Sequence, residues 1–314
     1  MARLPLNTLA AFRAVAEVQN LRAAADALYL THSAVSQQIR GLEEHLGFHL
    51  FDRRGRRVVL NAAGLALLRS VQGAFAQLDD GVQAAAAAAT GAAQRLRITV
   101  LPSFAQRWLL PRIARWRDRY PNLALEIDAS INAVDILREG FHAAVRQGTG
   151  PWPGVESERL FGQPPIIVVG SPSAARRLLG AAPEALAREP LLGHADLWKA
   201  WFAAAGLRTN VTTVAVFNDA GLMLQATEQN LGLALSREIL AADALADGRL
   251  VQLSPVSIVH GDAQPYHFVY PPSLRDWPPL QALRQWLRDE LDRSQHDLRT
   301  RAASAGRRRG GKGT

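Results

Sequence analysis

The sequence of 314 residues contains no cysteine, which excludes a disulfide framework and any thiolate metal site. It also contains no run of about 20 uncharged apolar residues, the length that a membrane-spanning helix needs. The alanine-rich stretch 80–93 is too short and too weakly apolar to cross a bilayer. The first twelve residues lack the apolar core of a secretory signal. We therefore expect a soluble, cytoplasmic protein with no membrane partner.

Lysine is nearly absent, because Lys199 and Lys312 are the only two, and basic character rests on arginine. Of the formal net charge of +8, the segment 299–314 carries +6, and the rest of the chain carries +2. The high isoelectric point is therefore weak evidence that the folded body binds nucleic acid. Because the segment 299–314 is rich in Gly, Ala and Arg, we expect it to be a disordered basic tail.

The sequence carries none of the short motifs that mark common enzyme classes. Its eight histidines show no H-E-x-x-H or other paired metal-ligand spacing, and no G-x-S-x-G nucleophile turn occurs. The glycine-rich stretch 147–154 lacks the lysine of a phosphate-binding loop. We therefore predict no catalytic residue, no cofactor and no metal site.

The first 61 residues contain three short helical patterns. Asn20 is placed to cap the second pattern, which begins at Leu21. The third pattern runs from about Ser33 to Leu46 and ends at Gly47, a common terminating residue. Its apolar positions recur at helical spacing: Val35, Ile39, Leu42 and Leu46. Two short helices joined by a tight turn, the second with one apolar and one polar face, predict a helix-turn-helix.

The polar face of the third helix has the composition of a base-reading surface. Ser33, Ser36, Gln37 and Arg40 form one continuous edge at helical spacing, and His32 precedes them at the amino end. Gln pairs with adenine, Arg with guanine, and Ser with a base or a phosphate. On the helix alone, an ordinary solvated face is the alternative.

A short hairpin after this helix carries four arginines. In "FHLFDRRGRRVVL", Gly55 suits the tip, and Arg53, Arg54, Arg56 and Arg57 flank it. Like charges at one tip repel one another unless an anion lies nearby, and a phosphate backbone supplies one. A helix-turn-helix followed by a basic wing is a more specific sign of double-stranded DNA binding than either part.

These elements resemble the winged-helix domain of LysR-type transcriptional regulators. The segments "LNTLAAFRAVAEVQNLRAAADAL", "SAVSQQIRGLEEHLG" and "LFDRRGRRVVLNAAG" follow the family pattern in order and spacing, and the resemblance extends over about residues 3–291. Two departures are His32, where the family usually has Gln, and Asn20, where it usually has Ser or Thr. The resemblance implies a winged helix-turn-helix domain plus a linker helix, followed by a two-lobed α/β effector domain of periplasmic-binding-protein type.

Residues 62–92 form a long, proline-free pattern that Asn61 can cap. Its loose apolar stripe comprises Leu65, Leu68, Phe75 and Leu78, with Val71 and Val82 nearby. The resemblance implies that this linker helix pairs two subunits into a dimer, or further into a tetramer. The dimer would read two half-sites of an imperfect palindromic promoter. Packing on its own domain is the alternative for this helix.

Residues 93–298 alternate strand and helix patterns, which predicts a parallel α/β arrangement in two lobes. The first lobe is expected at about 95–160 and 265–291, and the second at about 161–264. Ligands bind outside the carboxyl ends of parallel strands. This rule places Ser103, Phe104, Ser130 and Arg146 around one crevice.

This half looks more narrowly like the branch of the glycine-cleavage activator and the β-lactamase regulators. The resemblance implies a small-molecule effector, contact with RNA polymerase, and eight effector-binding residues: Ser103, Phe104, Ser130, Arg146, Phe217, Asn218, Asp219 and Tyr266. An arginine and hydroxyls near helix amino ends suit an anion such as a carboxylate. The alternatives are that Ser103 and Ser130 cap helices and that Arg146 pairs with an acid. Two adjacent prolines in "GQPPIIVV" depart from the family pattern.

A different class of function, a non-specific architectural DNA binder, would use the arginine-rich tail. That reading explains the tail but leaves the two-lobed half without a role. We therefore interpret the chain as a LysR-type DNA-binding regulator and not as an enzyme.

Overall fold

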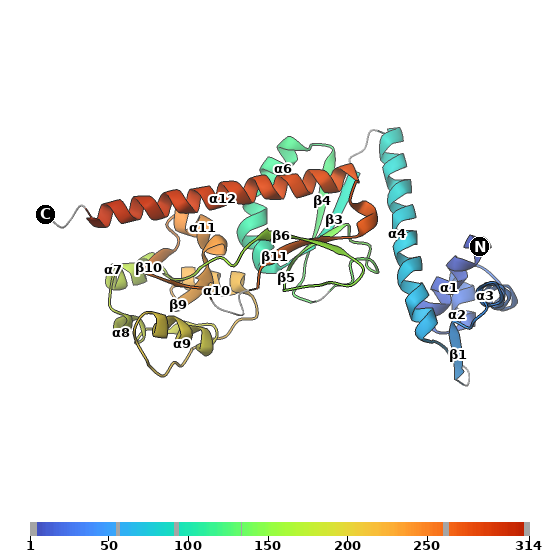
Figure 1. The fold of residues 1–314 in the computed structure, drawn as a ribbon, viewed down its shortest axis with the longest axis horizontal. Helices are drawn as coiled ribbons and strands as arrows, with labels where there is room; N and C mark the ends of the chain where they lie inside the picture. Colours follow the sequence, from blue (N-terminus) through green and yellow to red (C-terminus); the bar gives the residue numbers. More distant parts are fainter. Residues whose placement is uncertain (1–4, 55–56, 91–93, 133, 260–263, 311–314) are drawn as a thin grey trace. The chain divides into compact units, whose positions relative to one another are not determined.

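A computed structural model describes residues 5–54, 57–90, 94–132, 134–259 and 264–310 (Figure 1). The chain divides near residue 92 into two compact units. The N-terminal unit is mainly helical, and the C-terminal unit contains two β-sheets with helices packed on them.

The N-terminal unit packs three short helices against one another. They are α1 (Leu6–Val18), α2 (Leu21–Ala27) and α3 (His32–Leu46). The shared core includes the apolar stripe of α3 and small alanines of α2 that permit close helix approach: Leu9, Phe12, Val15, Ala24, Ala25, Val35, Ile39 and Leu42. The Asn20 side chain accepts hydrogen bonds from the amides of Arg22 (2.9 Å) and Ala23 (3.2 Å), so the predicted cap of α2 is confirmed. Helix α3 ends at Gly47, whose φ of 79° is in the left-handed region that favours glycine.

A two-stranded hairpin and a long helix follow. Strands β1 (Phe51–Arg54) and β2 (Arg57–Leu60) pair antiparallel, and α4 runs from Ala62 to Thr90. Asn61 accepts a hydrogen bond from the Gly64 amide (2.9 Å) and donates one to the His49 carbonyl (2.8 Å). This single side chain therefore caps α4 and ties it to the segment that enters the hairpin.

The C-terminal unit contains two sheets, which build two lobes. The first sheet has the order β4-β3-β5-β11-β6 and the second β10-β7-β9-β8. The strands of the first lobe are β3 (Gln94–Val100), β4 (Leu123–Ala129), β5 (Ala143–Gln147), β6 (Glu156–Phe161) and β11 (Tyr266–Tyr270). Those of the second lobe are β7 (Ile166–Gly170), β8 (Leu191–Leu192), β9 (Leu233–Arg237) and β10 (Val251–Ile258).

The sheets are mixed, whereas the sequence predicts a parallel arrangement. Strand β3 runs parallel to β4 and β5, but β11 runs antiparallel to both β5 and β6. In the second sheet, β7 runs antiparallel to β9 and β10. The reason is topological, because β11 re-enters the first sheet after the chain has passed through the second lobe. An alternation of strand and helix patterns does not reveal that reversal.

Helices cover both sheets. Those of the first lobe are α5 (Pro102–Phe104), the π-helix η1 (Ala105–Leu109), the 3₁₀ turns η2 (Leu110–Arg112) and η3 (Pro272–Leu274), and α6 (Ile113–Arg119). Those of the second lobe are α7 (Pro172–Leu178), α8 (Pro183–Leu186), α9 (Ala195–Ala204), α10 (Ala220–Glu228) and α11 (Glu238–Ala246).

The last helix, α12 (Pro278–Gly310), extends further than the sequence predicts. The expected disordered tail begins at residue 299, but the helix continues to Gly310 (Figure 1). Alanine and arginine are strong helix formers, and the segment 299–305 contains neither glycine nor proline to stop the helix. A composition rich in Ala and Arg is therefore compatible with a helix as well as with the expected tail.

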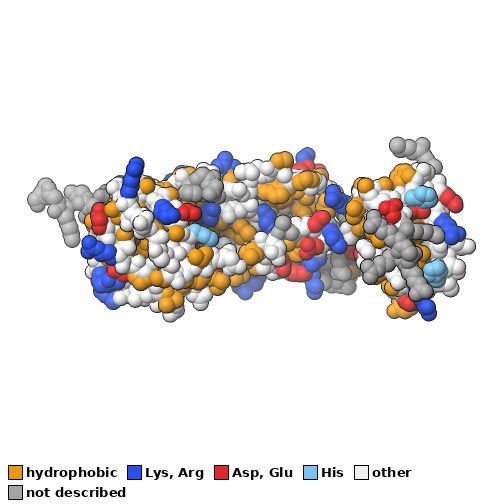
Figure 2. Space-filling view, turned by 90° about the horizontal axis from the view of Figure 1, so that it is seen from below, with side chains coloured by type: hydrophobic (Ala, Val, Ile, Leu, Met, Phe, Trp, Pro, Cys, Tyr) orange, Lys and Arg blue, Asp and Glu red, His pale blue; other side chains and the backbone are white. Residues whose placement is uncertain are grey.

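Arginine in the C-terminal unit is largely committed to ion pairs. Arg107 pairs with Glu228 and Arg112 with Asp243 in mostly buried positions. More exposed pairs include Arg177–Glu189, Arg275–Glu156 and Arg284–Glu158. On the face seen in Figure 2, blue and red side chains are interspersed over this unit. The small net charge outside the tail therefore reflects local pairing rather than a basic surface.

Candidate DNA-binding surface and effector pocket

Helix α3 presents the predicted polar edge to solvent. His32, Ser33, Gln37 and Arg40 are exposed, and Ser36 is half-buried. The opposite face is closed, since Val35, Ile39 and Leu42 are buried in the core. The helix therefore offers a continuous polar edge at its amino-terminal half, where side chains of a recognition helix reach base edges.

The start of α3 differs slightly from the predicted start. The helix begins at His32, and the Thr31 hydroxyl caps it by accepting a hydrogen bond from the Ala34 amide (3.2 Å). The Ser33 hydroxyl lies 3.1 Å from the Thr31 hydroxyl. Ser33 therefore also supports the cap, while the other predicted residues of the edge make no such contact among the described residues.

A groove of about 1010 Å³ runs between α3 and the hairpin, and Ser36, Arg40 and Asp52 are among the residues that line it. Glu43 joins its two sides, because its carboxylate accepts hydrogen bonds from the amides of Leu50 (2.7 Å) and Phe51 (3.3 Å). The base of the hairpin is thus fixed to the carboxyl-terminal half of α3.

The structure places part of the predicted wing. Arg53 and Arg54 lie in β1, with Arg53 opposite Val58 and Arg54 opposite Arg57. Arg56 lies outside the described residues. A two-stranded basic element beside the recognition helix is the arrangement that the sequence predicts.

A second pocket, of about 420 Å³, lies in the second lobe at the carboxyl ends of the parallel strands β8 and β9. The predicted residues Phe217, Asn218 and Asp219 line it. Six lining residues carry polar side chains: His194, Asp196, Asn218, Asp219, Ser236 and Arg237. We refer to this cavity, a candidate effector site, as the effector pocket.

Two helix amino ends border the effector pocket. Asp219 caps α10 by accepting hydrogen bonds from the amides of Gly221 (2.8 Å) and Leu222 (3.1 Å). His194 precedes α9 and makes no side-chain cap, and no side chain in the part of the chain that the structure describes accepts from the first amides of that helix. Free amides and the helix dipole make such an end suitable for an anion.

Tyr266 lies behind this pocket. Its ring is buried, stacks on Phe161 at 4.5 Å between centroids, and lies 5.9 Å from the guanidinium carbon of Arg237. Burial raises the pKa of the Tyr266 hydroxyl, while the charge of Arg237 lowers it and that of Asp219 raises it. The predicted residues Tyr266 and Asp219 therefore lie within electrostatic reach of one another and of Arg237.

The two predicted residues on α5 differ in role. Phe104 is fully buried, and its ring centroid lies 4.9 Å from that of Trp108 and 5.8 Å from that of Tyr266. It therefore packs in the core beside Tyr266 and does not line the pocket. The alternative role of Ser103 as a helix cap is wrong, because α5 already begins at Pro102. Helix α5 contacts α10, which places Ser103 on an element packed against the wall of the pocket.

Ser130 and Arg146 lie apart from the effector pocket. The Ser130 hydroxyl accepts a hydrogen bond from the Asn132 amide (3.2 Å) in a turn that no helix follows, so it caps no helix. Arg146 donates to the Thr99 hydroxyl (2.7 Å), and that hydroxyl donates to Asp128 (3.1 Å). The structure thus brings Phe217, Asn218 and Asp219 together in the pocket, whereas Tyr266, Ser130 and Arg146 do not line it.

The comparisons with known proteins agree with this architecture. Residues 6–65 match the family described as "Bacterial regulatory helix-turn-helix protein, lysR family", and residues 89–292 match "LysR substrate binding domain". The chain belongs to the LysR family of transcriptional regulators. The predicted fold class and the predicted regulator function are confirmed. This LysR-family protein is a DNA-binding regulator with an effector-binding domain, and not an enzyme.

Relatives cover nearly the whole chain. The activator AmpR of Citrobacter koseri is 34% identical over 290 residues, which cover 91% of this chain and 98% of that protein. The glycine cleavage system transcriptional activator of Escherichia coli K12 is 30% identical over 306 residues, which cover 95% of this chain and 97% of that protein. The effector domain of AmpR from Pseudomonas aeruginosa matches with a TM-score of 0.54 and 30% identity, covering 66% of this chain and 99% of that structure. The predicted resemblance to this branch is confirmed.

The structure of this LysR-family regulator draws attention to two residues that the sequence analysis did not single out. Tyr29 lies in the turn before α3 with 97% of its surface exposed and a φ of 55°. Arg237 lines the effector pocket at the end of β9. The available signal for Arg237 was its position directly after the apolar run "LALS", at a strand's carboxyl end.

Other classes of site find no support among the described residues. No group of three or more His, Asp or Glu side chains is placed to hold a metal ion in the part of the chain that the structure covers. No described helix is long and apolar enough to cross a membrane.

Proposed function

We propose that this regulator acts in the cytoplasm as a dimer or a tetramer that binds an imperfect palindromic promoter site. In this proposal, the edge formed by Ser36, Gln37 and Arg40 reads bases, and a small anionic effector in the effector pocket changes the assembly. The observation that supports it most is the division of α3 into a buried apolar face and an exposed polar edge beside the wing. An effector acts only if it binds one arrangement of the protein better than another.

The base-reading role is tested by selecting random duplex DNA with the purified protein at about 150 mM salt, which suppresses non-specific binding. We expect a symmetric motif with half-sites about one helical turn apart. Gln37→Ala and Arg40→Ala should each relax preference at one position, with a cost of about 1–3 kcal/mol on the best site. His45→Ala, on an exposed part of the same helix, is the matched control. Equal losses on all sequences would contradict the groove assignment.

The wing arginines have a different expected signature. Neutralising Arg53 and Arg54 together should weaken binding to every sequence by a similar factor and flatten the salt dependence. The selected motif should stay unchanged, because phosphate contacts carry no base information. A changed motif would instead assign these residues to base contacts.

Dimerisation is assigned to the exposed part of α4. Leu68 and Val71 are buried in the unit's own core, so the alternative of packing on its own domain holds for this half of the helix. Further along, Leu78 and Val82 are 64% and 67% exposed and lie one turn apart on one face. An apolar face that the chain itself leaves open suits a second copy of the same helix.

Sedimentation of the variant Leu78→Gln/Val82→Gln tests this assignment. We expect weaker dimerisation and a loss of affinity for a two-half-site DNA that exceeds the loss for a single half-site. Arg69→Gln, at an exposed position of the same helix, is the control. A stable dimer in the double variant would place the subunit contact elsewhere.

An anionic effector follows from the chemistry of the pocket. The guanidinium of Arg237 has no ion-pair partner among the described residues, and its buried Nε makes no hydrogen bond. Together with the open amino end of α9, this cation suits a carboxylate. Thermal unfolding with a panel of small carboxylates should find ligands that stabilise the wild type and not Arg237→Gln. Arg176→Gln, exposed on α7, is the control, and equal stabilisation of all three proteins would refute the assignment.

A further inference from the structure

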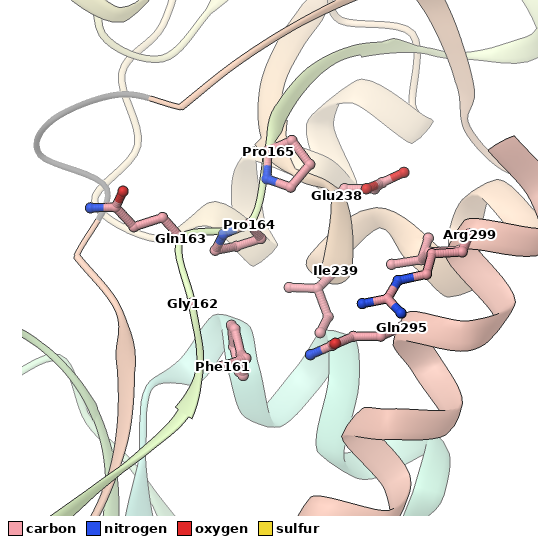
Figure 3. Close-up of a pocket in the computed structure, with 10 residues that line it drawn as sticks. Phe161, Gly162, Gln163, Pro164, Pro165, Glu238, Ile239, Gln295 and Arg299 are labelled. Atoms are coloured by element: carbon pink, nitrogen blue, oxygen red, sulfur yellow. The ribbon is translucent and has the colours of Figure 1, made fainter.

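A third cavity, of about 310 Å³, lies where the chain crosses from the first lobe to the second. Figure 3 shows it between the crossing segment 161–165, the start of α11 and the far part of α12. We call it the hinge pocket. It shares no lining residue with the effector pocket. Its volume lies at the lower end of the range of small-molecule sites.

One part of the hinge pocket is apolar and firmly held. Phe161 and Ile239 are buried, and Phe161 is stacked on Tyr266. Pro164 and Pro165 form the crossing segment, and the Pro165 carbonyl accepts a hydrogen bond from the Glu238 amide (2.9 Å). Proline fixes the backbone φ, so this wall is preformed. The two prolines that set this sequence apart from the family pattern therefore build a wall of a cavity.

The rim of the hinge pocket carries opposite charges that are not paired with each other. Glu238 is half-buried at the start of α11, and no described residue gives its carboxylate a hydrogen bond or an ion pair. Burial raises the pKa of this carboxyl group, as expected where no cation compensates it. Arg299 projects from α12 with no ion pair among the described residues, and Gln295 lies one turn before it (Figure 3).

Charges of both signs around an apolar wall fit a ligand of matching composition. We propose that the hinge pocket is a second ligand site, which takes a small zwitterion of the amino-acid type with an apolar side chain. Its ammonium group binds the Glu238 carboxylate, and its carboxylate binds the Arg299 guanidinium with the Gln295 amide beside it. Its side chain packs against Phe161 and the two prolines.

The position of this site connects it to the lobes. Its lining comes from the crossing segment, from α11 of the second lobe and from α12, which also contacts β6 of the first lobe. A ligand that fills it touches both lobes and the chain between them. Occupancy therefore biases the angle between the lobes without entering the effector pocket.

Direct binding to the full-length protein tests the proposal, and the result does not depend on DNA binding. The probes are L-valine, L-leucine, L-isoleucine, L-methionine and L-phenylalanine, measured by calorimetry and by ligand-observed NMR. Two analogues of leucine serve as controls: 3-methylbutylamine lacks the carboxylate, and 4-methylpentanoate lacks the ammonium group. We expect at least one amino acid to bind and, for leucine, both analogues to bind more weakly by about tenfold.

Variants assign the binding to the hinge pocket. Glu238→Gln and Arg299→Gln should each raise the dissociation constant of the amino acid about tenfold, whereas Glu238→Asp should retain part of the affinity. Arg237→Gln should leave it unchanged, because that residue belongs to the effector pocket. Circular dichroism checks that each variant is folded. Absence of binding by all five amino acids overturns the proposal, and so does binding that Arg237→Gln abolishes while the hinge-pocket variants retain it.

Discussion

Gly64, in the first turn of α4, has an environment that only glycine tolerates. A Cβ atom built on Gly64 would lie 2.1 Å from the Leu50 carbonyl oxygen and 2.6 Å from Cδ2 of Leu60. Both neighbours flank the basic hairpin, and Asn61 binds the same turn of the helix. Gly64→Ala should therefore displace α4 from the base of the wing.

The size of the effect follows from two opposed terms. Replacing glycine by alanine inside a helix normally stabilises it by about 0.8–1 kcal/mol. Overpacking against a backbone atom costs about 1–3 kcal/mol, because the neighbour is not a flexible side-chain end. We therefore expect Gly64→Ala to lower the stability of the N-terminal unit by up to about 2 kcal/mol. Gly73 is the matched control, since a Cβ there meets nothing within 4 Å, and Gly73→Ala should be stabilising by the propensity term alone.

Hydrogen exchange on the full-length protein measures this prediction, because peptides from the N-terminal unit report its opening separately from the rest of the chain. Peptides across α3 and the hairpin should exchange faster in Gly64→Ala and no faster in Gly73→Ala. Affinity for the selected operator should fall in the first variant only. Equal protection in the two variants would refute the argument that the contact with Leu50 and Leu60 positions the wing.

Three further perturbations test other contacts. Arg107→Met leaves Glu228 with one of its two arginine partners in a mostly buried site, so it should destabilise the C-terminal unit by about 2–3 kcal/mol in chemical denaturation. Burial and, to a smaller extent, the charge of Arg159 lower the pKa of His267 below its ordinary value of 6.5. The folded state therefore disfavours the protonated imidazole, so the contribution of His267 to stability is complete above pH 6.5 and is lost as the pH falls through the lowered pKa. In thermal unfolding at a series of pH values, His267→Phe should remove this loss of stability. Glu43→Ala should weaken operator binding without changing the selected motif, because the carboxylate binds the Leu50 and Phe51 amides and so holds the base of the hairpin.

Features that depend on local sequence were predicted correctly. The cap at Asn20, the end of α3 at Gly47 and the strand–turn–strand pattern after it need only neighbours within a few residues. The division of α3 into two faces is also local, because the period of a helix fixes it. The start of α3 lies within one residue of the expected start at about Ser33, because the helix begins at His32 and Thr31 is its cap.

Features that depend on tertiary contacts were predicted less well. Phe104 follows a strand at the expected edge of the sheet, but its burial depends on Trp108 and Tyr266, which lie on other elements. Arg146 was placed correctly near a strand end, yet its side chain turns to Thr99 and not to the effector pocket. The rule about strand ends selects an edge of the sheet and does not say which side chains converge there.

The arginines of the C-terminal unit differ in their contacts, and composition does not reveal this difference. Arg107 and Arg112 also have a buried Nε without a partner, but their Nη atoms bind Glu228 and Asp243. Arg237 has the same buried Nε and no acidic partner among the described residues, and it lies beside the open amino end of a helix. Arg237 is half-buried, and its guanidinium lies over the Tyr266 ring, so an anion bound in this pocket would add a compensating charge that the described residues do not supply. This difference distinguishes Arg237 from the arginines with structural roles and supports an anionic effector at that pocket.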